Sequence, residues 1–463
     1  MVQFLAALKA VIDGLGATIL LPVIIFFLAW FLGAKPAKAF RSGVMIGIAF
    51  IGINLVVGLM WGSLTEVGQA MVANTGVTRD IVDVGWPSAA AIAFGTQVGL
   101  WVIPVAILVN IVLLAARVTK TLNIDIWNFW HFAFIGSLVA IVTGNVFFGL
   151  VAAAIAAALA LFLADWTAKS VQHFYNLPGI SIPHLTSAPG VPIAIVTNWI
   201  VEKIPGLRDL DADPEAIQKK FGIFGDPVIL GLIIGLVLGI LGFYNAGDFA
   251  TVLSKVLGVG MNLAAVMYLL PKMVQILMEG LIPVSEAARD YMQKRSNAVD
   301  INIGLDSAIL IGHPAAISSS LILVPIAVLL SIILPGNRVV LFADLAIIPF
   351  VVAMMAPLFK GNVVRLIIGG TLELAVGFYI ATALAPLFTS AAVEAGFTMP
   401  EGASLIASIG DGFLWPPFLF AKSAEFLGIF GILILGALLV VAWFLFSKNR
   451  TAWEVAAGAP VEK

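Results

Sequence analysis

The chain has 463 residues, of which 61% are hydrophobic and 11% are charged, and its mean hydropathy is +1.10. Such a chain cannot cover its apolar surface with polar groups, which excludes an ordinary soluble domain and indicates a polytopic α-helical membrane protein. The formal net charge of −2 says little in sum, and the absence of cysteine excludes disulfides, thiolate metal sites and a phosphocysteine on this chain.

Apolar runs of roughly 17–25 residues recur along the chain, and each is long enough to cross a bilayer as a helix. We expect an all-α fold with about eleven transmembrane helices and two re-entrant hairpins. The spans expected in the first half are Val11–Leu32, Gly43–Trp61, Pro87–Ala116, Trp127–Val146 and Phe147–Leu163. Those expected in the second half are Val228–Phe243, Val256–Ile282, Ser320–Leu334, Val339–Phe359, Leu366–Phe388 and Leu427–Phe446.

A charged segment, 202–222, divides the chain into two membrane halves, 1–201 and 223–463. Because Lys and Arg collect in cytoplasmic loops, we expect this segment to be a cytoplasmic linker. Further clusters of Lys and Arg follow the first, third and last spans, at Lys35, Lys38, Arg41, Arg117, Lys120, Lys448 and Arg450. This distribution predicts an N-terminus outside the cell and a C-terminus in the cytoplasm.

Two short apolar segments are broken by Pro, Gly and Ser, and each carries a histidine. They are Ile180–Val191, with His184, and Leu305–Ser320, with His313. Interrupted hydrophobic segments in the two halves of a membrane chain are typical of a transporter's substrate site. We therefore expect re-entrant segments near 180–192 and 305–320, and a substrate site formed between them.

Asp306 opens the second of these segments without a basic residue within six positions on either side. An acid at membrane depth needs a partner, and a substrate hydroxyl is one candidate. A second interpretation, compatible with the first, makes Asp306 and Ser307 the N-cap of a half-helix.

The histidines at positions 131, 184 and 313 all lie in or beside apolar runs. Each could bind a ligand, and each could equally hydrogen-bond to a neighbouring helix. Their spacings match no zinc motif, so we expect no metal and no cofactor. The chain also has no phosphate-binding loop, so we expect neither direct use of ATP nor a nucleic-acid partner.

Asp83, Trp86 and the segment Asn128–His131 bring hydrogen-bonding groups and aromatic rings together. This combination suits a polyhydroxylated ligand, whose hydroxyls need hydrogen bonds while its C–H faces pack on rings. The tryptophans could equally belong to an interfacial aromatic belt.

Several motifs resemble one known family, the galactitol-specific membrane component (enzyme IIC) of the bacterial phosphoenolpyruvate-dependent sugar phosphotransferase system, in the ascorbate–galactitol superfamily. The matching stretches are Val82–Pro87 (VDVGWP), Asn123–His131 (NIDIWNFWH), Ser181–Ala188 (SIPHLTSA), Glu202–Gly206 (EKIPG), Gln218–Pro227 (QKKFGIFGDP), Ile303–His313 (IGLDSAILIGH) and Pro335–Asn337 with Asp344–Ala346. The resemblance fades after Phe388, so no role is assigned to 389–425.

The resemblance implies an inner-membrane homodimer of elevator type, with a dimerising scaffold and a mobile core. It also implies transport of galactitol or a related polyol that is coupled to phosphorylation of the sugar. The phosphoryl donor would be the phosphocysteine of a IIB protein, which acts together with a IIA protein. A polyol or pentose uniporter or secondary carrier without phosphorylation is the alternative.

The resemblance further implies sugar contacts at Gly58, Asp83, Trp86, His131, His184 and Asp306, with His313 added from its spacing. Asp306 would be the catalytic residue, as the base that polarises the attacking hydroxyl.

Overall fold

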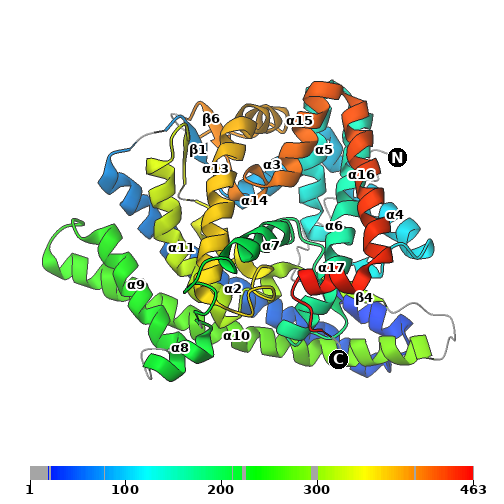
Figure 1. Cartoon of the computed structure of the whole chain (residues 1–463), viewed down its shortest axis with the longest axis horizontal. Coiled ribbons are helices and arrows are strands. Elements are labelled where there is room, and N and C mark those ends of the chain that lie inside the picture. Colours follow the sequence, from blue (N-terminus) through cyan, green and yellow to red (C-terminus); the bar gives the residue numbers. More distant parts are fainter. Residues whose placement is uncertain are drawn as a thin grey trace.

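The computed structural model describes residues 19, 22–77, 79–210, 212–221, 226–293, 301–341, 343–400 and 403–461. This part of the chain is mostly helical (Figure 1) and contains seven helices that are long and apolar enough to cross a membrane. They are Pro36–Thr75, Gln97–Ala115, Val146–Phe174, Phe249–Leu281, Pro314–Ile333, Val363–Glu394 and Ile429–Lys448. The chain is therefore a polytopic membrane protein.

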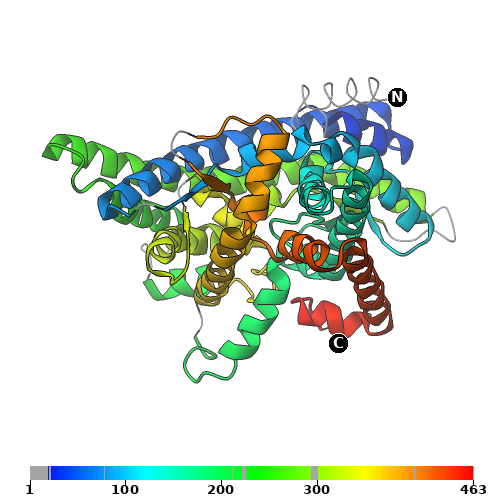
Figure 2. The same ribbon diagram turned by 90° about the horizontal axis from the view of Figure 1, so that it is seen from above.

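Three helices pack side by side along one side of the molecule (Figure 2). They are α2 (Pro36–Thr75), α9 (Pro227–Phe243) and α10 (Phe249–Gln293). Gly235 of α9 lies so close to α10 that a Cβ there would come within 2.8 Å of the Gly260 Cα. Small residues at this crossing let the two backbones approach closely, as in many helix pairs in membranes.

Most of the other helices form the rest of the molecule, around the points where helices are interrupted. They are α4 (Gln97–Ala115), α5 (Trp130–Thr143), α6 (Val146–Phe174), α7 (Gly190–Val201), α11 (Pro314–Ile333), α12 (Ile348–Ala353), α13 (Val363–Glu394), α15 (Trp415–Leu427), α16 (Ile429–Lys448) and α17 (Arg450–Ala456). The short helix α8 (Pro214–Phe221) lies in the charged segment between the two halves.

The structure corrects the all-α expectation, because it contains six short strands in two parallel sheets. The first sheet has the order β5 (Val339–Val340), β1 (Ile81–Asp83), β6 (Leu405–Ala407). The second has the order β2 (Thr121–Asn123), β4 (Asn302–Gly304), β3 (Ile180–Ser181). A broken helix leaves backbone N–H and C=O groups without partners, and pairing between the breaks satisfies them away from water.

Two expected spans are not single helices. The segment Pro87–Ala116 divides at Thr96 into α3 (Trp86–Gly95) and α4. The Thr96 hydroxyl accepts a hydrogen bond from the Gly99 backbone N–H (3.1 Å) and lies 2.7 Å from the Ser137 hydroxyl. A threonine that caps a new helix and also pairs with a neighbouring helix stabilises the break.

The segment expected as the span Val339–Phe359 instead comprises β5, the 3₁₀ turn η4 (Leu345–Ile347), α12 and a turn. The break is held at Asp344, whose backbone N–H donates to the Asp83 carboxylate at 2.8 Å. Of the first expected span, Val11–Leu32, only part lies within the described residues, where Pro22–Phe31 is helical. The basic segment at Ser285 continues α10 as far as Gln293.

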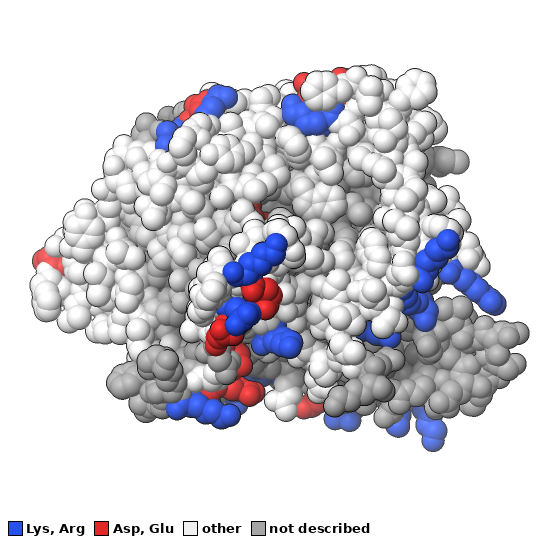
Figure 3. Space-filling view, in the orientation of Figure 1, with Lys and Arg blue, Asp and Glu red and all other residues white. Residues whose placement is uncertain are grey.

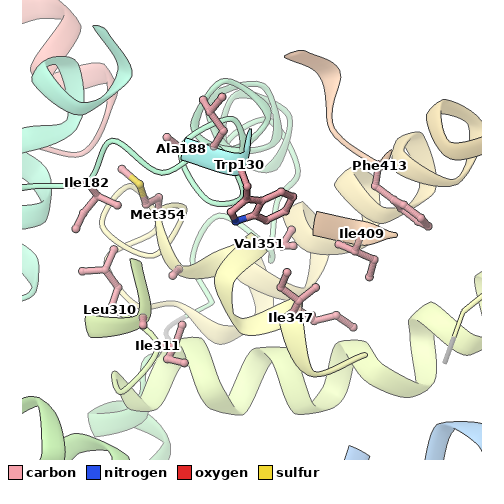
Figure 4. Packing of buried hydrophobic residues seen from close by; sticks show 14 of the residues in the cluster. Trp130, Ile182, Ala188, Leu310, Ile311, Ile347, Val351, Met354, Ile409 and Phe413 are labelled. Atoms are coloured by element: carbon pink, nitrogen blue, oxygen red, sulfur yellow. The ribbon is translucent and has the colours of Figure 1, made fainter. Parts of the chain in front are cut away.

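The segments that follow the strands share a buried apolar core (Figure 4). Five of them contribute labelled side chains to it, among them Trp130, Ile182, Leu310, Ile347 and Ile409. Close packing of these segments against one another holds the neighbouring polar residues in fixed positions.

Candidate functional site

A cavity of about 440 Å³ lies between α2 and the segments that follow five of the six strands. One wall comes from α2, through Phe50, Ile53, Asn54, Val57, Gly58 and Trp61. The opposite side is formed by Trp86, Asn128, Trp130, His184, Thr186, Asp306, Ala308, Ile347 and Phe350. The strands of each sheet are parallel, so their carboxyl ends lie at the same edge of that sheet. The residues that follow five of these ends line the cavity.

Strand pairing places two carboxylates next to each other at one end of the cavity. Asn123 of β2 pairs with Gly304 of β4. Asp125 and Asp306 each follow two residues after these paired positions. The side-chain amide of Asn128 donates to Asp125 (2.8 and 3.0 Å) and to Asp306 (2.9 Å).

Asp306 has two roles in this geometry. Its Oδ1 accepts from the Ala308 backbone N–H at 2.8 Å and caps the 3₁₀ turn η3 (Ser307–Ile309). Its side chain is 23% exposed and lines the cavity. The cap fixes the carboxylate in place while leaving it accessible to a ligand, so the two interpretations of this residue hold together.

His184 lies beside Asp306, in the turn after β3. Its Nδ1 accepts from the Thr186 backbone N–H at 3.2 Å, so the ring proton of the neutral imidazole sits on Nε2. Nε2 is 3.6 Å from Asp306 Oδ1, which is longer than a hydrogen bond. A ligand hydroxyl within hydrogen-bond reach of both atoms would accept from Nε2 and donate to the carboxylate.

His131 lies directly behind this cavity wall and is 1% exposed. Its Nδ1 is 3.0 Å from Oδ2 of Asp411, which is fully buried, and its Nε2 is 3.4 Å from the Thr186 hydroxyl. The ring is also 4.8 Å, centroid to centroid, from that of His184. A carboxylate on Nδ1 fixes the orientation of the imidazole, and His131 in turn contacts two residues that line the cavity.

A chain of carboxylates ties together the segments after β1, β5 and β6. Asp83 accepts from the backbone N–H groups of Gly85 (3.0 Å) and Asp344 (2.8 Å). Asp344 accepts from the Trp86 backbone N–H (2.7 Å) and from Ser408, through its hydroxyl (2.5 Å). These buried acids accept hydrogen bonds from backbone N–H groups in the segments that follow the strands, and they thereby set the position of Trp86.

Three tryptophans form an aromatic face of the cavity. The ring centroids of Trp61 and Trp86 are 5.7 Å apart, and those of Trp86 and Trp130 are 6.5 Å apart. The Trp130 indole N–H donates to the Asn128 side-chain oxygen at 3.2 Å, which links this face to the polar end. The cavity can therefore offer hydrogen bonds at one end and ring faces along its side.

The structure brings four of the predicted site residues together in the cavity wall, namely Gly58, Trp86, His184 and Asp306. His131 lies one layer behind them. Asp83 is 1% exposed and directs its carboxylate to backbone N–H groups, away from the cavity lining. His313 lies elsewhere: its Nδ1 accepts from the Ala315 N–H at the start of α11, and its ring packs 4.5 Å from that of Phe174.

Sequence reasoning did not single out Asn54, Thr186, Phe350, Asp125 or Asp411. Thr186 and Asp125 lie within motifs already noted, and only the turn and strand geometry shows which way they face. Asp411 belongs to the short helix α14 (Ile409–Gly412), in a stretch to which the sequence assigned no role. The Asp-Gly pair after a short apolar run was the only sign of it.

Three possible metal ligands lie close together in this site. One ligand atom from each of Asp125, His184 and Asp306 lies within 4.8 Å of the others. The Asn128 amide already donates to both carboxylates, so the group is organised by hydrogen bonds from a neutral donor. This arrangement suits a hydroxyl-bearing ligand without requiring a cation.

Comparison with known proteins gives one family and close relatives. The model of the family described as "PTS system sugar-specific permease component" (EIIC-GAT) matches residues 10–402. The PTS system galactitol-specific EIIC component of Escherichia coli (strain K12) is 38% identical over 443 residues, which are 96% of each chain. A putative permease IIC component of the same strain is 36% identical over 442 residues, 95% of this chain and 98% of that protein.

Proposed function

The chain belongs to the family of PTS sugar-specific permease components, and from this premise we propose that it transports galactitol, or a closely related polyol, across the bacterial inner membrane and presents it for phosphorylation by a IIB protein. The observation that carries the proposal is Asp306, an accessible carboxylate fixed between Asn128 and His184 at the polar end of the cavity. The galactitol-specific relative supports the choice of a hexitol.

The lining of the cavity supports a linear polyol. Such a molecule carries a hydroxyl on each carbon and has apolar C–H faces between them. Asn128, His184, Thr186 and Asp306 offer both donors and acceptors, and the tryptophan rings offer surfaces for the C–H faces.

In the proposed reaction, Asp306 accepts the proton of the polyol hydroxyl as the hydroxyl oxygen attacks phosphorus. The new O–P bond forms while the S–P bond of the IIB phosphocysteine breaks, and the sulfur leaves as a thiolate. Asn128 and the Ala308 N–H hold the Asp306 carboxylate, and His184 would hold the sugar hydroxyl, because phosphoryl transfer depends chiefly on positioning and charge stabilisation.

The transport step is proposed to be of elevator type, in a homodimer with a dimerising scaffold and a mobile core. Its support is the division of the cavity between one helix, α2, and segments that all follow strands. Movement of those segments as one body past α2 would carry a bound sugar with them. We further propose re-entrant segments near 180–192 and 305–320, an outside N-terminus and a cytoplasmic C-terminus.

The test is phosphoenolpyruvate-dependent formation of labelled galactitol phosphate by membrane vesicles that contain this chain, supplied with the soluble phosphotransferase components. A panel of other polyols and pentoses sets the specificity. We expect galactitol phosphate inside the vesicles. Uptake of free sugar without phosphorylation would contradict the coupled mechanism and favour a carrier.

A further inference from the structure

We call the cavity lined by His184 and Asp306 the sugar cavity. A second hollow, of about 1020 Å³, shares none of its lining residues. Four stretches of chain border it: the end of α6, the last turns of α7 with the residues after it, the segment 357–360 and the segment 455–461. We call this hollow the basic groove. Its volume is more than twice that of the sugar cavity.

The charged groups in the basic groove leave an excess of positive charge. Lys203 and Lys360 line it and are exposed, and His173 lies beside them. Glu202, the acid that lines it, already pairs with Arg365 at 2.5 Å. An anionic group entering the groove would meet two ammonium groups.

An aromatic side chain is exposed next to these charges. Trp199 lines the basic groove and is 62% exposed, with the Lys203 ammonium 3.1 Å from its ring centroid. Tryptophan is enriched at protein–protein contacts, where it often carries much of the binding energy.

Two elements connect the basic groove with the sugar cavity. Helix α7 starts just after the turn that holds His184 and Thr186, and its last turns line the groove. The chain from Phe350 to Lys360 likewise lines the cavity at one end and the groove at the other. The twelve residues of α7 span about 18 Å at 1.5 Å per residue.

The chain after α7 carries charges of both signs. In Figure 3, Lys and Arg side chains lie interspersed with Asp and Glu over the region of α7 and the chain that follows it. The segment 202–222 and the C-terminal residues are also those that the distribution of Lys and Arg predicts to be cytoplasmic. A soluble cytoplasmic partner would meet this face.

We propose that the basic groove is the docking surface for the phosphoryl-donor protein, with Lys203 and Lys360 binding its anionic face and Trp199 packing against it. This inference rests on the proposed function, which requires a phosphorylated partner. Lysines bind anionic groups as point charges, so the two ammonium groups would hold acidic groups of the partner's surface, while its phosphocysteine has to reach Asp306 in the sugar cavity. Docking here contacts α7, which follows the turn holding His184 and Thr186, and the chain from Phe350 to Lys360.

The experiment measures binding of purified IIB protein of the galactitol phosphotransferase system, phosphorylated and unphosphorylated, to the full-length protein in nanodiscs. The test variant is Lys203→Glu/Lys360→Glu. The matched control is Lys35→Glu/Lys38→Glu, which changes the net charge equally at two exposed lysines outside the groove. Polyol binding and thermal unfolding of each variant report whether it is folded.

We expect the groove variant to bind phosphorylated IIB at least tenfold more weakly, with polyol affinity unchanged and with the control close to wild type. Lys203→Gln/Lys360→Gln, which removes charge without reversing it, should have a smaller effect in the same direction. Wild-type affinity in the Glu variant, or equal losses in the control, would overturn the docking assignment. Groove-dependent binding of IIB without formation of polyol phosphate would support the docking surface while refuting the proposed function.

Discussion

Asp125 and Asp306 share one hydrogen-bond donor, the side-chain amide of Asn128. The two acids are 181 positions apart in the sequence, yet each follows the paired residues Asn123 and Gly304 by two positions. Backbone pairing between two short strands therefore sets the polar end of the cavity. The side chains complete a geometry that the main chain has already fixed.

Asp306→Asn is expected to abolish phosphorylation of the polyol while keeping measurable binding. The asparagine oxygen can still accept from the Ala308 N–H and cap η3, but an amide cannot take the proton of the attacking hydroxyl. The measurements are the rate of polyol phosphate formation and the polyol dissociation constant. Asp306→Ala, which also removes the cap, should lose stability as well. Wild-type rates in Asp306→Asn would refute the role as base.

His131→Ala and His184→Ala are each expected to weaken polyol binding by about 1–3 kcal/mol, as is typical of lost buried hydrogen bonds. Asp411→Leu should act through His131, because Asp411 contacts the imidazole and does not line the cavity. Calorimetric dissociation constants for the single variants and for His131→Ala/Asp411→Leu provide the test. We expect the double variant to bind about as weakly as His131→Ala alone, and Asp411→Asn to retain more affinity than Asp411→Leu. Fully additive losses would show that the two residues act independently.

Gly58→Leu is expected to prevent polyol binding without unfolding the protein. A Cβ added at Gly58 meets no heavy atom within 4 Å, and the residue lines the cavity, so the new side chain would fill space that the sugar needs. Gly62→Leu is the matched control. It lies one turn further along α2, is exposed, and also has free space for a Cβ, but it does not line the cavity. Equal polyol affinities in the two variants would place the ligand elsewhere.

Glu373→Met is expected to raise the thermal unfolding temperature. Glu373 is 5% exposed in α13, and neither of its carboxyl oxygens has a hydrogen-bond partner among the described residues. A buried polar group without a partner costs roughly 1–3 kcal/mol, which an unbranched apolar side chain of similar size avoids. Glu394→Met, at the exposed end of the same helix, should change the temperature little. A lower unfolding temperature for Glu373→Met would reveal a structural role for the acid.

Polyol binding is expected to be independent of divalent cations. Asp125, His184 and Asp306 offer ligand atoms close together, but the Asn128 amide, a neutral donor, already donates hydrogen bonds to both carboxylates. Titration of the polyol in the presence of EDTA should give the same dissociation constant as in its absence. A loss of affinity that added Mg²⁺ or Mn²⁺ restores would contradict this.

The sequence predicted the membrane class and much of the site, because composition and helix-breaking residues are local properties. Pro and Gly around His184 and Asp306 marked the broken segments, and both residues line the cavity. The strands could not be predicted, since two or three residues carry no periodicity and their pairing partners lie far away in the sequence. The His131–Asp411 contact was missed for the same reason: it joins residues 280 positions apart.

The cavity beside α2 is built from two unlike halves, and this has a consequence for how specificity can diverge among related permeases. The polar half depends on the register of paired strands, so an insertion or deletion of one residue in β2 or β4 would misalign its reacting groups. The other half is one face of a regular helix, α2, where positions such as Asn54 and Gly58 can be exchanged singly without disturbing that register. New substrates are thus expected to arise first through substitutions along α2, while the chemistry at the opposite end stays the same.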